Sequence, residues 1–191
     1  MKGKIFNAQE VQAILNGSKV MFREVVKPYP ILSDDKSYWE FKGVRWAGEK
    51  SSYAKKFGDN AKPEMPDLCP YQVGQKIFCK ETFSDERFGE SLIYKCADVR
   101  KEKVSHWRTA SNMKQEHSRL TPLIKEIRVE RLAEISEEDA IAEGVMNHLR
   151  IVHYNPVEYF RQLWNATHKK PEEKFETSPF CWVVSFEVIN N

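Results

Sequence analysis

The sequence lacks the long apolar runs, the charge excess and the clustered cysteines that mark several protein classes. No apolar run approaches the roughly 20 residues that a membrane-spanning helix needs. The basic N-terminus is not followed by the apolar stretch of a secretory signal. Lysines and arginines number 30 against 28 aspartates and glutamates, which excludes histone-like, charge-driven binding. The four cysteines are widely spaced, so neither a disulfide framework nor a structural zinc site is expected, and the sequence predicts a reduced, cytoplasmic protein.

The common catalytic signatures are missing as well. The chain has no GxxxxGK[ST], no GxGxxG after a strand, no HExxH and no GxSxG. Its five histidines show no metal-ligand spacing with supporting carboxylates or cysteines. We therefore expect no metal and no other cofactor.

What the sequence does contain is typical of one globular domain. Of its 191 residues 41% are hydrophobic and 12% aromatic. We expect a single domain over 1–191, with an insertion at about 33–66 where proline and polar residues replace periodic patterning. Within it, Tyr38 to Trp46 suggests a hairpin around Lys42 and Gly43.

Apolar periodicity and capping residues predict the remaining elements. Helices are expected at about 8–16, at 136–144 and from Pro156 onward, each preceded by a residue that can cap it. Alternating or apolar runs predict strands at 19–27, 76–83, 91–97, 123–132 and 181–189. This order favours an α+β fold with a mostly antiparallel sheet, plausibly a small barrel.

Two features of the predicted strands suggest chemistry. Lys19 and Arg23 share one strand face, where they could clamp a phosphate or a carboxylate or simply face solvent. Glu81 shares its strand face with apolar residues, so this carboxylate needs a partner. If Lys19 or Arg23 is that partner, the pair could be a structural ion pair or an acid/base centre.

A third candidate region is basic. Residues 99–131 hold nine lysines and arginines against four glutamates, with Trp107 and Met113 among them. Cations interleaved with an aromatic residue are typical of single-stranded nucleic-acid surfaces, although a solvated basic loop has the same composition.

Five segments together resemble the ASCH-domain proteins of phages and prophages. They are GSKVMFREVVKP, CPYQVGQKIFCKETF, RVERLAEISEEDAIAEGV, PVEYFRQLWNAT and SPFCWVVSFEVI. The resemblance covers nearly the whole chain except about 33–66 and 144–154. It implies a PUA-like small, mostly antiparallel β-barrel with short flanking helices. It also implies a basic cleft at the barrel mouth that binds RNA, a nucleotide or a modified nucleoside.

The resemblance and the basic stretch together suggest roles for individual residues. In the preferred hypothesis Lys19, Arg23 and Arg119 would contact phosphate, Trp107 of the basic stretch would stack on a base, and Glu81 would fix Lys19 or a base amino group. Family members that hydrolyse N4-acylated cytidine use a lysine, a threonine and a glutamate, which map to Lys19, Phe22 and Glu81.

Phe22 cannot act as the threonine nucleophile, so binding is the preferred expectation. A hydrolase, of the amidohydrolase or ribonuclease type, that uses Lys19, Glu81 and a water molecule is the first alternative. A phage accessory or scaffold protein that meets a protein partner through 33–66 is the second. No membrane partner is expected.

Overall fold

The computed structural model describes residues 1–34, 39–42, 44–46, 51–52, 65–86, 92–96, 102, 104–145 and 155–189. The helices in these ranges are α1 (Ala8–Leu15), α2 (Glu137–Ala142) and α3 (Pro156–Thr167). The strands of the first half are β1 (Lys2–Ile5), β2 (Met21–Val25), β3 (Ile31–Leu32), β4 (Trp39–Phe41), β5 (Val44–Trp46) and β6 (Ser51–Ser52). The later strands are β7 (Ile77–Lys80), β8 (Phe83–Ser84), β9 (Ile93–Tyr94), β10 (Thr121–Arg131) and β11 (Phe180–Ile189).

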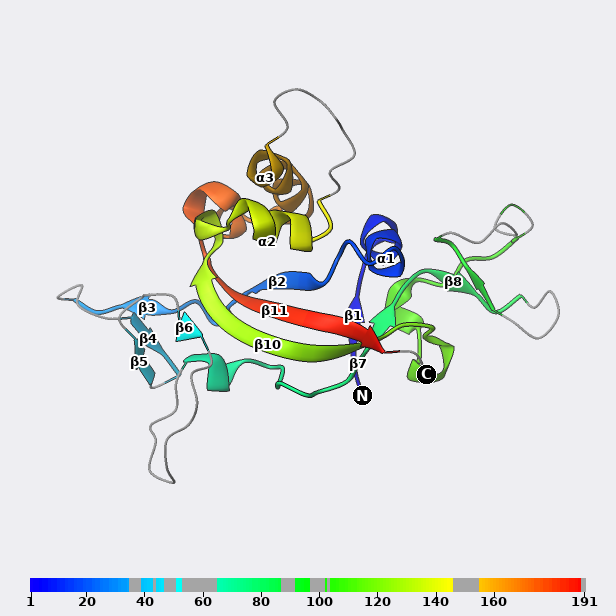
Figure 1. Cartoon of the computed structure of the whole chain (residues 1–191), viewed down its shortest axis with the longest axis horizontal. Coiled ribbons are helices and arrows are strands. Elements are labelled where there is room, and N and C mark those ends of the chain that lie inside the picture. The colour runs from blue at the N-terminus through cyan, green and yellow to red at the C-terminus, as the bar shows by residue number, and fades with distance from the viewer. Residues whose placement is uncertain are drawn as a thin grey trace.

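The long antiparallel pair of β10 and β11 forms the centre of the molecule (Figure 1). It belongs to a four-stranded sheet in the order β2-β11-β10-β6, with a register shift between Ile124 and Glu126. Beside it, β1 and β7 pair in parallel as a separate two-stranded sheet. The two sheets meet where the amide of Cys79 donates to the carbonyl of Leu120 over 3.0 Å. This contact places the segment that carries Glu81 next to the one that carries Arg119.

The predicted PUA-like small barrel is wrong. The described strands form separate sheets of two, four, three and two strands, and no closed barrel is found among them. The four-stranded sheet stays open because its edge strands, β2 and β6, do not pair with each other. The segments of β7 and β10 are joined only by one isolated bridge among the described residues, Lys76 with Leu123, and by a few backbone hydrogen bonds. The structure is α+β, as predicted, but its described strands do not close into a barrel.

Local sequence explains why the helices begin where they were predicted. Asn7 and Glu10 form a capping box at α1, in which each side chain accepts a hydrogen bond from the other residue's backbone amide. Ser136 accepts from the amide of Asp139 at α2, and Asn155 caps α3 just before Pro156. The three predicted helices are confirmed, and each starts within one or two residues of its expected position.

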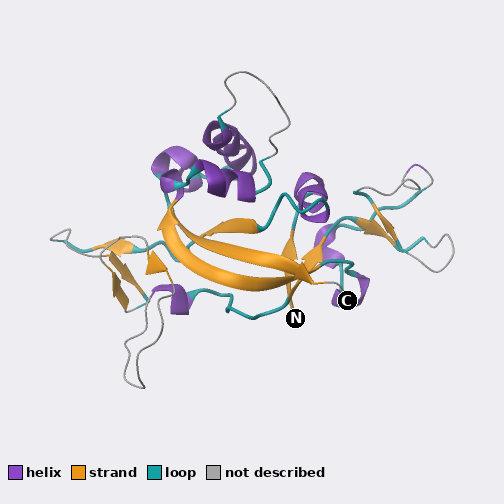
Figure 2. Cartoon of the chain, viewed as in Figure 1, coloured by secondary structure: helices purple, strands orange, loops and turns teal. Residues whose placement is uncertain are grey.

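The two halves of the core lie on opposite faces of the central sheet. One cluster packs β2, β7, β10 and β11 around large side chains such as Phe22, Ile77 and Trp182. The other packs the helical layer onto the sheet through Leu132, Phe160 and Trp164. Figure 2 shows α2 and α3 together on one side of the strands. The second cluster therefore holds α2 above β2, which sets up the ion pairs described below.

Parts of the predicted insertion belong to this framework. β3, β4 and β5 form a three-stranded antiparallel sheet, so the predicted hairpin is confirmed, although Tyr38 and Gly43 lie outside the described residues. The ring of Trp39 meets Phe180 edge-on at 5.0 Å between centroids, and Phe41 meets Trp182 at 5.9 Å. Most of the rest of 33–66 also lies outside the described ranges.

No helix in the described part of the chain is both long and apolar enough to cross a bilayer.

Candidate functional site

Lys19 and Arg23 come together as expected, but the carboxylate that they clamp belongs to the protein itself. The ammonium of Lys19 donates to Glu143 Oε2 over 2.8 Å and to the Glu143 carbonyl over 2.9 Å. Arg23 Nη1 donates to Glu143 Oε1 over 3.1 Å. Glu10 of α1 adds a further carboxylate 3.5 Å from Lys19. Both cationic side chains are buried, with 3% and 0% of their surfaces exposed.

The cluster extends from β2 to β10 and α2. Arg23 Nη2 bonds to Glu130 and lies 2.7 Å from Asp139 Oδ2, and Asp139 also pairs with Arg128. Burial acts to lower the pKa of Arg23, but the surrounding carboxylates, Glu143 first, outweigh it and raise that pKa. Burial acts to raise the pKa of Asp139, and the two arginines reverse the effect and lower it.

We call this set the ion-pair network: Lys19, Arg23, Arg128, Glu130, Asp139 and Glu143. It carries three cations and three anions, so its charges cancel internally. A phosphate that approached Lys19 or Arg23 would have to displace a carboxylate that is already in place. The network therefore joins α2 to the sheet.

Phe22 belongs to the core. Its side chain is 2% exposed and meets the rings of Phe6 and Tyr71 edge-on, at centroid distances of 6.0 and 5.3 Å. Alternation along β2 turns it away from Lys19 and Arg23, so it takes no part in their cluster.

Glu81 has a partner that the sequence analysis did not anticipate. Arg119 forms a bidentate pair with it, in which Nε and Nη2 each donate to one carboxylate oxygen over 2.9 Å. The Glu81 side chain is buried, and 27% of the Arg119 side chain is exposed. Arg119 also donates to the Cys96 carbonyl over 3.0 Å. Burial acts to lower the pKa of Arg119, but the hydrogen bonds and charge of Glu81 outweigh it and raise that pKa.

Two cation–aromatic contacts lie on consecutive residues beside this pair. The guanidinium of Arg119 sits 4.2 Å from the ring centre of Tyr94, whose hydroxyl donates to the His117 carbonyl over 2.9 Å. The ammonium of Lys95 sits 5.8 Å from the ring centre of Trp107. Lys95 is exposed, and Tyr94 and Trp107 are half-buried. We call these four residues (Tyr94, Lys95, Trp107 and Arg119) the aromatic–cation wall.

The five predicted site residues thus fall into two groups. Lys19 and Arg23 share the ion-pair network, whereas Glu81, Arg119 and Trp107 lie at or beside the aromatic–cation wall. Lys19 and Glu81, expected as an acid/base pair, are held by different partners. Tyr94 and Lys95 were not singled out, although an aromatic residue next to a cation in a predicted strand is a usable signal. Arg100, Lys101 and Lys103 of the basic stretch lie outside the described residues.

The wall occupies a projecting part of the fold. β8 and β9 form a two-stranded hairpin to which the segment carrying Trp107 is bridged through Phe83 and Arg108. Figure 1 shows β8 extending away from the central pair of strands, on the side opposite β3–β5. Chemically, the wall offers two aromatic rings, the positive charge of Lys95 and a guanidinium whose charge is balanced by the buried carboxylate of Glu81.

No family model, curated protein or solved structure matches the chain.

Proposed function

We propose that the chain binds a nucleotide or single-stranded nucleic acid, RNA in the first instance, on the aromatic–cation wall. The observation that carries the proposal is the presence of two cation–aromatic pairs, Arg119 with Tyr94 and Lys95 with Trp107, on the β8–β9 hairpin and the segments bonded to it. Proteins that bind single strands combine phosphate neutralisation with base stacking on aromatic rings. Trp107 and Tyr94 supply the rings, and Lys95 and Arg119 the charges.

The pairing of Glu81 with Arg119 supports a positioning role for this glutamate. A bidentate carboxylate fixes the plane of the guanidinium, and 27% of the Arg119 side chain remains exposed to a ligand. In this proposal Arg119 contacts phosphate or a base edge, and Glu81 holds it in place. Lys19 and Arg23, expected as phosphate contacts, take no direct part.

Binding is favoured over hydrolysis because the residues of the expected catalytic set have no common centre. Lys19 is engaged by Glu143, Glu81 by Arg119, and the ring of Phe22 is packed in the core. The proposal retains the resemblance to ASCH-domain proteins as to ligand class and leaves out the closed barrel. It also places the protein in the cytoplasm, where four free thiols such as these are ordinary.

Titration of the whole protein against fluorescein-labelled single-stranded RNA and DNA of equal sequence tests the proposal. We expect Trp107→Ala to weaken binding by about 5- to 160-fold, since stacking contributes about 1–3 kcal/mol per base. We expect Lys95→Ala to lower the slope of log affinity against log salt by about 0.7, the value for one phosphate contact on a single strand.

Lys125→Ala is the matched control for Lys95→Ala. Lys125 is also exposed, but it lies on β10 and pairs with Glu187 over 3.0 Å. This variant should bind RNA as the parent protein does. Absence of RNA and DNA binding, or equal losses in Lys95→Ala and Lys125→Ala, would refute the proposed site.

A further inference from the structure

A second site lies away from the wall, beside β2 and β11. It is a cavity of about 260 Å³ whose apolar lining consists of Val25 and Trp182 of the sheet together with Leu68 and Pro70. At about 30 Å³ per water molecule, this space suits a ligand of about nine non-hydrogen atoms. The remaining lining residues are polar: two glutamates, two lysines and one histidine.

Each glutamate in the lining has one oxygen engaged and one open. Glu24 Oε2 accepts from Lys4 over 2.8 Å and from the Tyr71 hydroxyl over 3.0 Å. Glu173 Oε1 accepts from the Tyr29 hydroxyl over 3.1 Å and pairs with Lys27 at 2.6 Å. Within the described part of the chain, Glu24 Oε1 and Glu173 Oε2 have no hydrogen-bond partner, so both can accept from a ligand.

His168 adds a third acceptor. Its Nδ1 lies 3.1 Å from the Trp164 carbonyl and 3.1 Å from the Thr167 hydroxyl. Because the carbonyl can only accept, these contacts favour the tautomer with the proton on Nδ1 and the lone pair on Nε2. The imidazole stacks on the Trp164 ring at 3.8 Å between centroids, which fixes its plane. Burial also lowers the pKa of His168, which keeps the ring neutral at neutral pH.

The two lysines supply the opposite charge. Lys27 is bound to Glu173, and half of its side chain remains exposed. Lys42, at the end of β4, lies 5.3 Å from the Phe41 ring centre and has no carboxylate partner among the described residues. The lining therefore carries two carboxylates and two lysine ammonium groups. One oxygen of each carboxylate and the ammonium of Lys42 are available to a ligand.

We propose that this cavity binds a free amino acid with an apolar side chain. The ammonium group would donate to the open oxygens of Glu24 and Glu173 and to His168 Nε2, and the carboxylate would pair with Lys42. The apolar side chain would pack against Trp182 and Leu68. A nucleotide is too large for a cavity that suits about nine non-hydrogen atoms. The inference is independent of the proposed nucleic-acid binding, because the two sites share no residue.

Isothermal titration of the full chain with L-leucine and two analogues tests the proposal. Isopentylamine keeps the ammonium and side chain without the carboxylate, and 4-methylpentanoate keeps the carboxylate without the ammonium. We expect saturable binding of leucine and at least tenfold weaker binding of either analogue, equivalent to about 1.4 kcal/mol. No saturable heat with leucine up to about 10 mM would overturn the proposal. Equal binding of leucine and either analogue would do the same.

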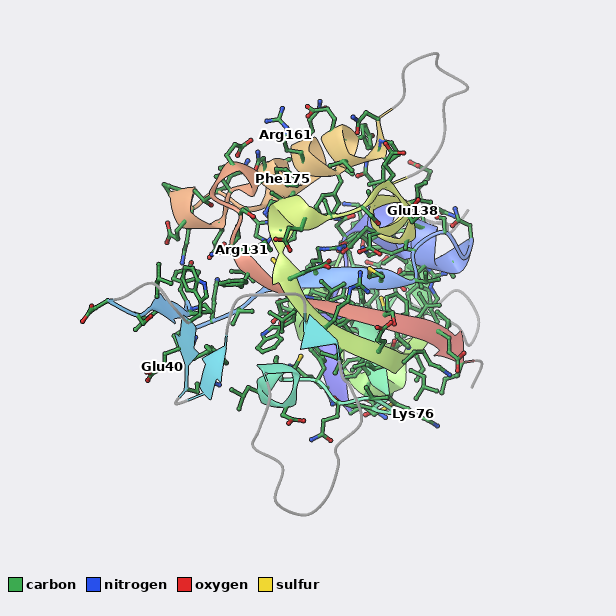
Figure 3. The ribbon with its side chains drawn as sticks, turned by 60° about the vertical axis from the view of Figure 1, so that its left-hand side comes forward. Glu40, Lys76, Arg131, Glu138, Arg161 and Phe175 are labelled. Atoms are coloured by element: carbon green, nitrogen blue, oxygen red, sulfur yellow. The ribbon has the colours of Figure 1, made fainter. Side chains whose placement is uncertain are left out.

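Substitutions then locate the binding. Lys42→Ala should weaken leucine binding at least tenfold, whereas Lys76→Ala, a matched exposed lysine labelled in Figure 3, should leave it unchanged. Glu173→Gln should also weaken it, with the exposed Glu138→Gln on α2 as control. Lys42 is exposed and has no carboxylate partner among the described residues, so Lys42→Ala remains a test of the site even if Glu173→Gln fails to fold. Equal losses in Lys42→Ala and Lys76→Ala would contradict the site.

Discussion

Replacing Arg23 with alanine should be among the most destabilising single changes in this chain. The side chain of Arg23 is fully buried and binds Glu130, Asp139 and Glu143. Without it, the carboxylate of Glu130, only 1% exposed, loses its closest cation and keeps the weaker contact with Arg128 at 3.5 Å. Removing one partner from a buried ion-pair cluster costs about 3–5 kcal/mol, because the remaining charges stay desolvated.

Urea unfolding followed by far-ultraviolet circular dichroism measures this loss. A denaturant slope of about 3 kcal/mol per molar converts it to a fall of about 1–2 M in the midpoint. Arg161→Ala is the control, since Arg161 makes its ion pairs with Glu158 and Glu176 on the exposed helical face seen in Figure 3. That variant should unfold at the parent midpoint.

A second substitution distinguishes lost charge compensation from lost packing. In an Arg23→Ala background, Glu130→Gln removes one of the uncompensated charges and should restore part of the stability. A midpoint for Arg23→Ala within about 0.3 M of the parent, below about 1 kcal/mol at this slope, would refute the structural role of the network. So would a further loss on adding Glu130→Gln.

Three other predictions concern titration, backbone and thiols. Because the folded state lowers the pKa of Asp139, its stabilisation is present above the ordinary value of 3.8 and is lost as the pH falls through the lowered pKa. The difference in urea midpoint between the parent and Asp139→Asn should therefore be largest near neutral pH and vanish in acid. Gly144 and Gly17 both have positive φ, but a Cβ on Gly144 would lie 2.9 Å from the Cβ of Lys19, and one on Gly17 meets nothing within 4 Å. Gly17→Ala should thus cost about 1–2 kcal/mol in thermal or urea unfolding and Gly144→Ala more, and equal costs would contradict the packing. Burial raises the pKa of Cys69 to about 11, so mass spectrometry after iodoacetamide at pH 8 should find this thiol unmodified in the native protein and alkylated in urea.

Helices and long strands could be predicted because their signals are local. Asn7 with Glu10, and Asn155 with Pro156, contain the capping chemistry within four residues, and alternation along β10 predicts a half-buried strand. β1 was missed because Lys2 to Ile5 has no hydrophobic pattern, and its pairing comes from β7. The prediction of a closed barrel was wrong for a similar reason. Whether a sheet closes depends on which strand edges meet in space, and no local sequence pattern encodes this.

The ion-pair partners of the charged residues could be predicted only in part. The sequence indicated that Lys19 and Arg23 share a face and that Glu81 needs a partner, and both expectations follow from strand periodicity. The partners themselves, Glu143 and Arg119, lie 124 and 38 residues away along the chain. Asp139 of α2 and Glu143, directly after that helix, are both carboxylate partners of Arg23, and no local pattern indicates this pairing.

Photo-crosslinking with single-stranded RNA that carries 4-thiouridine, followed by peptide mapping, tests the central claim most directly. The account predicts crosslinks in the segment 92–96 and in 104–119, at or beside Tyr94 and Trp107, with loss of the latter in Trp107→Ala. Crosslinks concentrated at 19–23, where Lys19 and Arg23 are buried in the ion-pair network, would contradict it.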